Sequence, residues 1–116
     1  MRTIEFYKSP SGRCPIETFL DSLSDMQVTK ITWVLKLVQE LDRVPVKYFK
    51  KLKGTDDIWE VRTNVGSDTF RILGFMHHNS LVVLTNSFQK KRQKTPAGEI
   101  SLAEKRKKDY LSRRTT

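Results

Sequence analysis

The residues best suited to chemistry in this sequence form a short cationic run behind an apolar segment. The stretch Phe88–Pro96 carries four cations within five residues. Positive charge of this density at the end of a strand attracts the phosphate backbone of a polyanion without sequence-specific contacts, and the ring of Phe88 offers a surface on which a base can stack. A basic run is also typical of a solvated face or of a charge-mixed helix start, so both interpretations stay open. The cations are Lys90, Lys91, Arg92 and Lys94.

A second group of charged side chains lies in segments that alternate as strands do. In the expected strand 58–64, Glu60 and Arg62 share the polar face, and the opposite face is left for helices to cover. Arg71 interrupts an otherwise apolar segment, so it is either buried with a partner or faces a groove. A cross-strand ion pair with Glu60 is the structural interpretation of both arginines, and it stays open beside a functional one.

A third basic segment precedes these strands. Residues 46–54 interleave lysines with aromatic side chains and end at Gly54. We interpret this segment as a connector. It carries Lys50, Lys51 and Lys53.

The residues that usually bind metals are too few or too badly placed for a metal site. Cys14 is the single cysteine, which excludes an internal disulfide and a four-thiolate zinc site. His77 and His78 are neighbours, and neighbouring side chains on a strand point to opposite faces, so we expect the two rings to diverge. No metal or other cofactor is expected.

Length and charge set the broad class of the protein. The 116 residues are enough for one domain with one core, so we expect residues 1–116 to form a single domain. Nothing resembles a signal peptide or a membrane span, and a cytoplasmic location is expected. The net charge of +9 favours a polyanionic partner, namely nucleic acid, an acidic protein or anionic lipid. Residues 87–116 hold 10 cations against 3 acidic residues, so most of this charge lies in the last quarter.

The elements that must position these residues begin with a strand and two helices. Residues 3–7 alternate as a strand does. Helices are predicted at 15–23, with Pro15 as the first helical residue, and at 25–42, with Ser24 as N-cap. Apolar residues at spacings of three and four give the two helices one face to bury as a hairpin.

A sheet and a last helix follow. Strands are predicted at 58–64, 69–76 and 81–86, close enough together to form an antiparallel meander. The last helix is predicted at 96–112, with Thr95 as its N-cap, and the residues after it are expected to be disordered from Arg113 onward. The predicted fold class is therefore α+β.

Four short sequence motifs occur in a specific order: Leu52–Gly54, Trp59–Arg62, Phe70–Leu73, and Phe88–Pro96 followed by Glu99-Ile100. Together with the order of elements, they resemble the phage-derived branch of the HigB toxins in the RelE/ParE superfamily. The resemblance covers nearly the whole chain and implies a RelE-like fold.

The resemblance implies the toxin of a type II toxin–antitoxin pair, an mRNA interferase that cleaves mRNA in the ribosomal A site. The RNA's own 2′-hydroxyl attacks the phosphate, giving a 2′,3′-cyclic phosphate and a 5′-hydroxyl, without a metal. The implied partners are a helix-turn-helix antitoxin of the HigA type, the ribosome with its mRNA, and operator DNA bound through the antitoxin. No membrane partner is implied.

The resemblance also implies site residues. Charge grows on the phosphoryl oxygens and on the leaving 5′-oxygen during this attack, so fixed cations are the main source of stabilisation, and arginine grips phosphate in a bidentate way. The implied catalytic residues are Arg62, Lys53, Lys91 and Arg71. The implied RNA-binding residues are Lys50, Lys51, Phe88, Lys90, Arg92 and Lys94.

A group for proton transfer is missing from this set. Some relatives have a tyrosine or histidine where a general base or acid is needed, and this chain has neither in the stretch Lys90–Pro96. Tyr110 lies deep in the last helix, and His77 and His78 lie in a hairpin turn. Either a lysine of lowered pKa serves, or positioning by the ribosome carries the reaction.

Two other functions stay open. A ParE-like toxin shares the fold and inhibits DNA gyrase by binding. A non-catalytic basic module binds nucleic acid or a partner protein without cleaving it, with affinity that depends steeply on salt.

Overall fold

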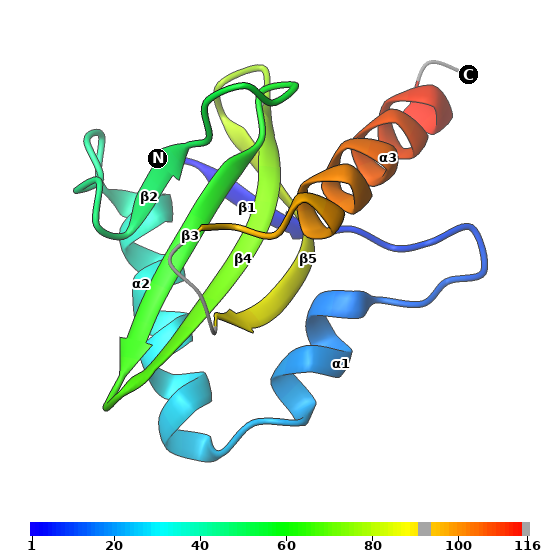
Figure 1. Ribbon diagram of the computed structural model, residues 1–116. Coiled ribbons are helices and arrows are strands. Elements are labelled where there is room, and N and C mark those ends of the chain that lie inside the picture. The colour runs from blue at the N-terminus through cyan, green and yellow to red at the C-terminus, as the bar shows by residue number, and fades with distance from the viewer. Residues whose placement is uncertain (91–93, 115–116) are drawn as a thin grey trace.

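The computed structural model describes residues 1–90 and 94–114, and within them the chain forms a five-stranded sheet with helices on both faces (Figure 1). The sheet order is β1-β5-β4-β3-β2. This α+β architecture confirms the predicted fold class. The strands are β1 (Thr3–Phe6), β2 (Phe49–Lys51), β3 (Trp59–Val65), β4 (Asp68–His77) and β5 (Leu81–Lys90).

The central three strands form the predicted meander, and two further strands widen it. Strands β3, β4 and β5 pair antiparallel through tight turns. Strand β1 pairs parallel to β5, and β2 pairs antiparallel to β3. The prediction that residues 46–54 are only a connector was therefore wrong, because three of them form an edge strand whose residue Lys50 lies opposite Glu60.

Helices α1 (Pro15–Asp21) and α2 (Asp25–Glu40) cover one face of the sheet. Both are slightly shorter than predicted. Ser24 is the N-cap of α2, as predicted, and forms a capping box in which its hydroxyl accepts from the Gln27 amide and its amide donates to Gln27 Oε1. The helix ends at Glu40 because Leu41 is already extended, with ψ of 133°.

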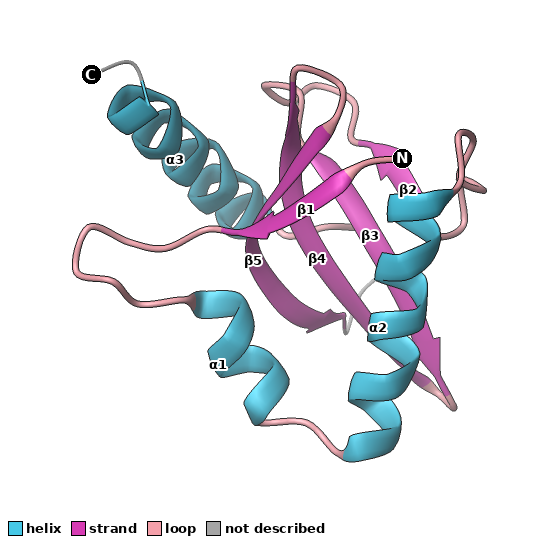
Figure 2. Cartoon of the chain, turned by 180° about the vertical axis from the view of Figure 1, so that it is seen from behind, coloured by secondary structure: helices cyan, strands magenta, loops and turns pink. Residues whose placement is uncertain are grey.

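The two helices pack on the sheet more than on each other. Figure 2 shows them splayed apart, with α1 against β5 and α2 against β3. The main core lies between these helices and the sheet. Its buried members are Ile16, Ile31, Val34, Leu35, Val38, Phe49, Val61, Phe70, Ile72, Val82 and Leu84.

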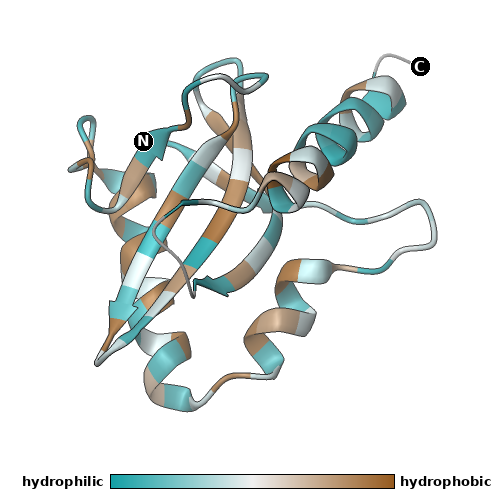
Figure 3. Ribbon diagram, viewed as in Figure 1, coloured by the Kyte–Doolittle hydropathy of each residue, from teal (hydrophilic) through white to brown (hydrophobic). Residues whose placement is uncertain are grey.

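Helix α3 (Ala97–Arg114) lies on the opposite face of the sheet, and largely polar contacts hold it against the rest of the chain. It buries only Ala103 and Tyr110, and Figure 3 shows it as mostly hydrophilic. The helix includes Arg113 and Arg114, so the expected disorder was wrong for these two residues, while 115–116 lie outside the described residues. Arg113 is held by the Lys8 carbonyl at 2.6 Å and by Asp109 at 2.8 Å.

A β-bulge at Thr85 changes which side chains of β5 face α3. Leu73 pairs with Asn86 whereas Gly74 pairs with Leu84, so no residue of β4 lies opposite Thr85 in the strand register. An extra residue of this kind resets the alternation of a strand. Beyond the bulge, Asn86, Phe88 and Lys90 therefore face the same side as Val83 does before it.

Strand β5 also continues further than predicted. It runs to Lys90 rather than ending at 86, because residues 87–90 pair with residues 69–72 of β4. None of the helices in the described ranges is long and apolar enough to cross a membrane.

Candidate functional site

The register of four strands gathers charged side chains on the face that α3 only partly covers. Directly opposite residues of an antiparallel pair share a face, so each pairing below joins two side chains on this side of the sheet. We call the cations Lys50, Arg62, Arg71 and Lys90, with the carboxylate of Glu60 among them, the basic cluster. The pairs are Lys50 with Glu60, Arg62 with Arg71, Arg71 with Phe88, and Lys90 with Thr69.

Glu60 is the centre of the basic cluster. Its carboxylate is fully buried, and its Oε2 lies 2.7 Å from Arg71 Nη1. Thr95 Oγ1 donates to the same oxygen at 2.9 Å and accepts from Arg71 Nη1 at 2.8 Å. A buried charge is stabilised when it is paired and hydrogen-bonded, and Glu60 and Arg71 meet both conditions. The predicted ion pair of Arg71 with Glu60 is confirmed.

Arg62 is held less tightly than Arg71. Its Nη2 lies 3.7 Å from Glu60 Oε1, and its side chain is 32% exposed, against 2% for Arg71. The predicted ion pair of Arg62 with Glu60 is present, but along one strand and at a length beyond hydrogen bonding. Arg62 is therefore the arginine of the basic cluster that faces solvent.

Lys90 is a cation in an unfavourable place. Its partial burial, followed by the positive charges of Arg71 and Arg62, lowers the pKa of its ammonium group below the usual 10.5. Glu60 acts in the opposite direction and raises it, but more weakly. The structure thus contains a lysine whose pKa is lowered by burial and by neighbouring cations, and a lysine of lowered pKa is one of the two options left open for proton transfer.

A pocket of about 690 Å³ adjoins the basic cluster. It is lined by Lys53 and Lys94 at exposed positions, by Thr95, and by apolar residues that include Pro96 and Ile100. Because Thr95 belongs to both, the pocket and the Glu60 network share a wall. Lys53 and Lys94, which are 41 positions apart in the sequence, are thereby brought together beside the basic cluster.

Comparison with protein families decides the family of the chain. The model of the family described as Phage derived protein Gp49-like (DUF891) matches residues 18–108, most of the chain. This protein belongs to the Gp49-like family. That family is one of RelE/HigB-like toxins, so membership is consistent with a toxin of a toxin–antitoxin system. No curated protein matches the chain.

Two predicted site residues of this Gp49-like protein, Lys51 and Phe88, have contacts outside the basic cluster. Lys51 follows Lys50 on β2 and so points to the other face, where it pairs with Asp57 at 2.6 Å on the exposed surface. This contact and the positive charge of Lys51 lower the pKa of the Asp57 carboxyl. Phe88 is partly buried and packs with Ile58 and Leu73 beneath α3.

Two further predicted residues, Lys91 and Arg92, lie outside the described residues. Of the predicted set, the structure gathers Arg62, Arg71, Lys50 and Lys90 on one face. Lys53 and Lys94 lie in the adjoining pocket.

Thr95 and Glu60 were not among the predicted site residues. Thr95 was predicted to be the N-cap of the last helix, and this was wrong because α3 begins at Ala97 and the Thr95 hydroxyl bonds Glu60 and Arg71 instead. The alternation of β3 placed Glu60 on the correct face. Nothing in the sequence indicates that Thr95 reaches back to it across 35 positions.

The histidines and Tyr110 of this Gp49-like protein lie at the opposite end of β4. The rings of His77 and His78 lie 3.9 Å apart, so the prediction that they diverge was wrong. His78 has a positive φ of 58° and belongs to the turn, where strand alternation no longer applies. Tyr110 is buried against Phe75, and burial is the largest cause that raises the pKa of its hydroxyl to about 12.

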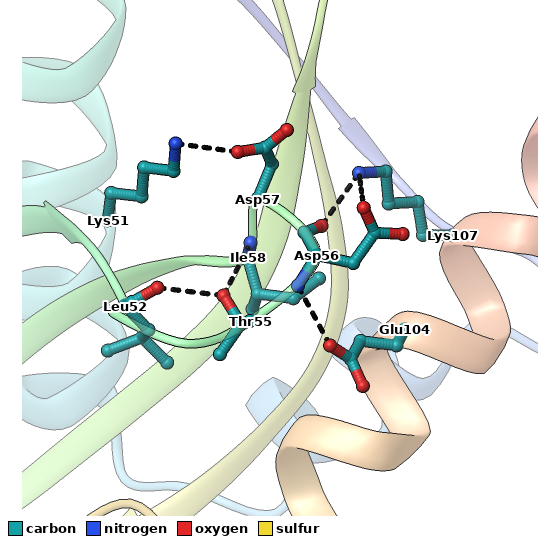
Figure 4. Close-up of polar contacts among 8 residues, drawn as sticks. All are labelled: Lys51, Leu52, Thr55, Asp56, Asp57, Ile58, Glu104 and Lys107. Carbon is teal, nitrogen blue, oxygen red and sulfur yellow. Dashed lines mark hydrogen bonds and ion pairs between the residues drawn. The ribbon is translucent and has the colours of Figure 1, made fainter.

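Helix α3 is fixed from two sides, at its first turn and near its middle. Asn86 donates through Nδ2 to the carbonyl and the carboxylate of Glu99 in the first turn. On the other side, the Asp56 amide donates to Glu104, and Lys107 contacts the carbonyl and carboxylate of Asp56 (Figure 4). The β2–β3 loop and strand β5 therefore both anchor the helix that follows the basic cluster.

Proposed function

We propose that this Gp49-like protein is a HigB-type mRNA interferase, the toxin of a type II toxin–antitoxin pair. It cleaves mRNA in the ribosomal A site, with the RNA's 2′-hydroxyl as nucleophile and without a metal. Its proposed partners are the ribosome, a helix-turn-helix antitoxin and, through the antitoxin, operator DNA. It acts in the cytoplasm.

The observation that carries this proposal is the basic cluster itself. Cations from β2, β3, β4 and β5 converge on one partly open face, and Glu60 is the carboxylate that lies among them in the part of the chain that the structure describes. Fixed cations of this kind stabilise the charge that develops on a phosphate under attack. Arg62 is the group best placed to contact that phosphate, because its guanidinium is both charged at every physiological pH and accessible.

Lys90 is the proposed proton-transfer group. Burial and the charges of Arg71 and Arg62 lower its pKa, which makes its ammonium group a stronger acid toward the leaving 5′-oxygen than that of an ordinary lysine. It lies among the same cations that would bind the phosphate. In this step Lys90 donates a proton to the 5′-oxygen, and the proton of the attacking 2′-hydroxyl is lost to solvent water.

The proposal is tested by inducing the protein in cells and mapping new mRNA 5′ ends. We expect 5′-hydroxyl ends aligned with codons, and loss of both these ends and growth arrest in Arg62→Ala. The fold of Arg62→Ala should persist, because this side chain is partly exposed and its ion pair is long. The matched control is Lys36→Ala, which removes an exposed cation from α2 on the other face of the sheet and should leave cleavage unchanged.

Two results contradict the proposed function, and a third contradicts the role of Arg62. Intact message together with DNA damage indicates gyrase inhibition, and RNA binding without any cleavage in the presence of ribosomes indicates a binding module. Undiminished growth arrest by folded Arg62→Ala removes Arg62 from the mechanism.

A further inference from the structure

Two arginines share one carboxylate in the basic cluster, and they do so unequally. Arg71 Nη1 contacts Oε2 of Glu60 at 2.7 Å, and Thr95 contacts the same oxygen. The other oxygen, Oε1, has Arg62 at 3.7 Å and no hydrogen-bond donor among the residues that the structure describes. One side of the carboxylate is thus saturated and the other is only loosely paired.

A buried carboxylate oxygen without a donor is unusual, because leaving such an acceptor unsatisfied is destabilising. The Oε1 atom is buried, and among the described residues Arg62 is the cation that forms an ion pair with it. The distance is within ion-pair range, yet the guanidinium extends into a partly exposed position. This geometry suits a side chain that alternates between Glu60 and a ligand.

We propose that Glu60 and Thr95 are positioning residues for RNA cleavage, which assign different tasks to the two arginines. Through Oε2, Glu60 and Thr95 fix Arg71 as a buried support. Through Oε1, Glu60 holds Arg62 in a ready position, from which its guanidinium transfers to the scissile phosphate. This assignment rests on the proposed function, and it moves Arg71 from contact with RNA to support of Arg62.

The transfer of Arg62 is favoured by the strengths of the two contacts. A long, partly exposed ion pair contributes little, whereas a bidentate contact between guanidinium and phosphate is strong and directional. Glu60 keeps Arg71 and Thr95 as partners when Arg62 leaves, so the carboxylate is never a buried charge without compensation. The basic cluster therefore releases Arg62 without dismantling itself.

Thr95 links this arrangement to α3. Its hydroxyl is both acceptor and donor, bonding Arg71 and Glu60, and the helix that follows is fixed by the contact of Asn86 with Glu99. Valine has the same shape without the hydroxyl, and serine keeps the hydroxyl. These two substitutions separate the hydrogen bonds from the packing of the side chain.

The test compares cleavage of ribosome-bound mRNA by Thr95→Val and Thr95→Ser with the wild type. We expect Thr95→Val to lower the maximal cleavage rate by about tenfold while the concentration for half-maximal rate changes by less than about twofold. Thr95→Ser should stay within about threefold of the wild type. Thr29→Val, at an exposed position on α2, is the matched control and should not change either value. Equal rates for Thr95→Val and the wild type would overturn the proposal, as would a loss confined to affinity.

A second measurement does not depend on cleavage. Nitrogen-15 NMR of the arginine side chains follows Arg62 and Arg71 while a 2′-O-methyl oligonucleotide of mixed sequence is added. We expect the Arg62 signal to shift and the Arg71 signal to stay, and in Glu60→Gln we expect the free-state Arg62 signal to change as well. A shift of Arg71 alone refutes the assignment of tasks. Absence of cleavage by the wild type, with the expected NMR shifts, refutes the proposed function and leaves the division between the two arginines standing.

Discussion

Lys90 occupies a position where a positive charge is disfavoured, and this gives its titration a measurable effect on stability. Burial and the charges of Arg71 and Arg62 lower its pKa in the folded protein, whereas unfolding restores the ordinary value of 10.5. Between these two values the unfolded chain binds more protons than the folded one. The free energy of unfolding therefore rises with pH in that interval.

Replacing Lys90 removes this rise. We expect Lys90→Met to be more stable than the wild type at neutral pH, and the difference to shrink as the pH approaches 10.5. Lys90→Arg should also lack the rise, since a guanidinium does not titrate in this range. Urea denaturation at a series of pH values measures the effect. A constant difference between wild type and Lys90→Met at all pH values contradicts it.

At the residue scale, the sequence predicted which side chains share a face but not how each is held. Alternation along β3 placed Glu60 and Arg62 together, and the ion pair of Arg71 with Glu60 was one of two stated options. Arg71 is held more firmly than Arg62 in part because it contacts the Thr95 hydroxyl, and Thr95 lies 35 positions from Glu60 in the sequence. Local pattern carries no information about a contact of that range.

At the scale of elements, the backbones of β4 and β5 approach each other closely at Gly74, next to the bulge. A Cβ atom added at Gly74 would overlap the backbone carbonyl oxygen of Val83. We expect Gly74→Ala to lower the free energy of unfolding by about 2–3 kcal/mol, because backbone cannot move aside as a flexible side chain can. Denaturant unfolding followed by circular dichroism measures the change.

Gly98 is the matched control for that substitution. It lies in the first turn of α3, and a Cβ atom there meets nothing within 4 Å. Gly98→Ala should raise the free energy of unfolding by about 0.5–1 kcal/mol, since alanine loses less backbone entropy on forming a helix. A loss of stability in both variants would mean that close contact is not the cause at Gly74.

The capping box of α2 gives a smaller and more local prediction. Ser24→Ala removes the hydroxyl that accepts from the Gln27 amide, so we expect the free energy of unfolding to fall by about 1 kcal/mol. Ser24→Gly should lower the free energy of unfolding by only about a few tenths of a kcal/mol. Urea denaturation distinguishes the two. Equal losses for alanine and glycine would indicate that the cap does not determine the start of α2.

The elements that were predicted correctly have local signals, and those that were missed lack them. Ser24 and Pro15 mark helix starts, and the three central strands have alternating or continuous apolar residues between clear turns. Strand β2 has only three residues within a lysine-rich segment, so only its pairing with β3 defines it. The bulge at Thr85 likewise exists only in the register between two strands.

At the scale of the whole molecule, the net charge of +9 predicts that binding to RNA weakens as salt is added. The dependence of log affinity on log salt concentration has a slope of about −0.7 for each phosphate neutralised on a single strand. Arg62→Ala should make that slope shallower by about 0.7, whereas Lys36→Ala should leave it unchanged. Fluorescence titration of an oligonucleotide at several salt concentrations measures both. Identical slopes for Arg62→Ala and the wild type would place Arg62 away from the phosphates.

The position of Thr95 after the last strand has a consequence for the protein while it is being made. Synthesis proceeds from the N-terminus, yet β1 pairs with residues 81–84, and the hydroxyl that completes the Glu60 network follows all five strands. Glu60 and Arg71 therefore leave the ribosome before their common partner does. A nascent chain can complete the sheet once β5 has emerged, but the hydroxyl that contacts both Arg71 and Glu60 is missing until Thr95 has emerged. The basic cluster is thus completed only after all five strands of the sheet have been synthesised.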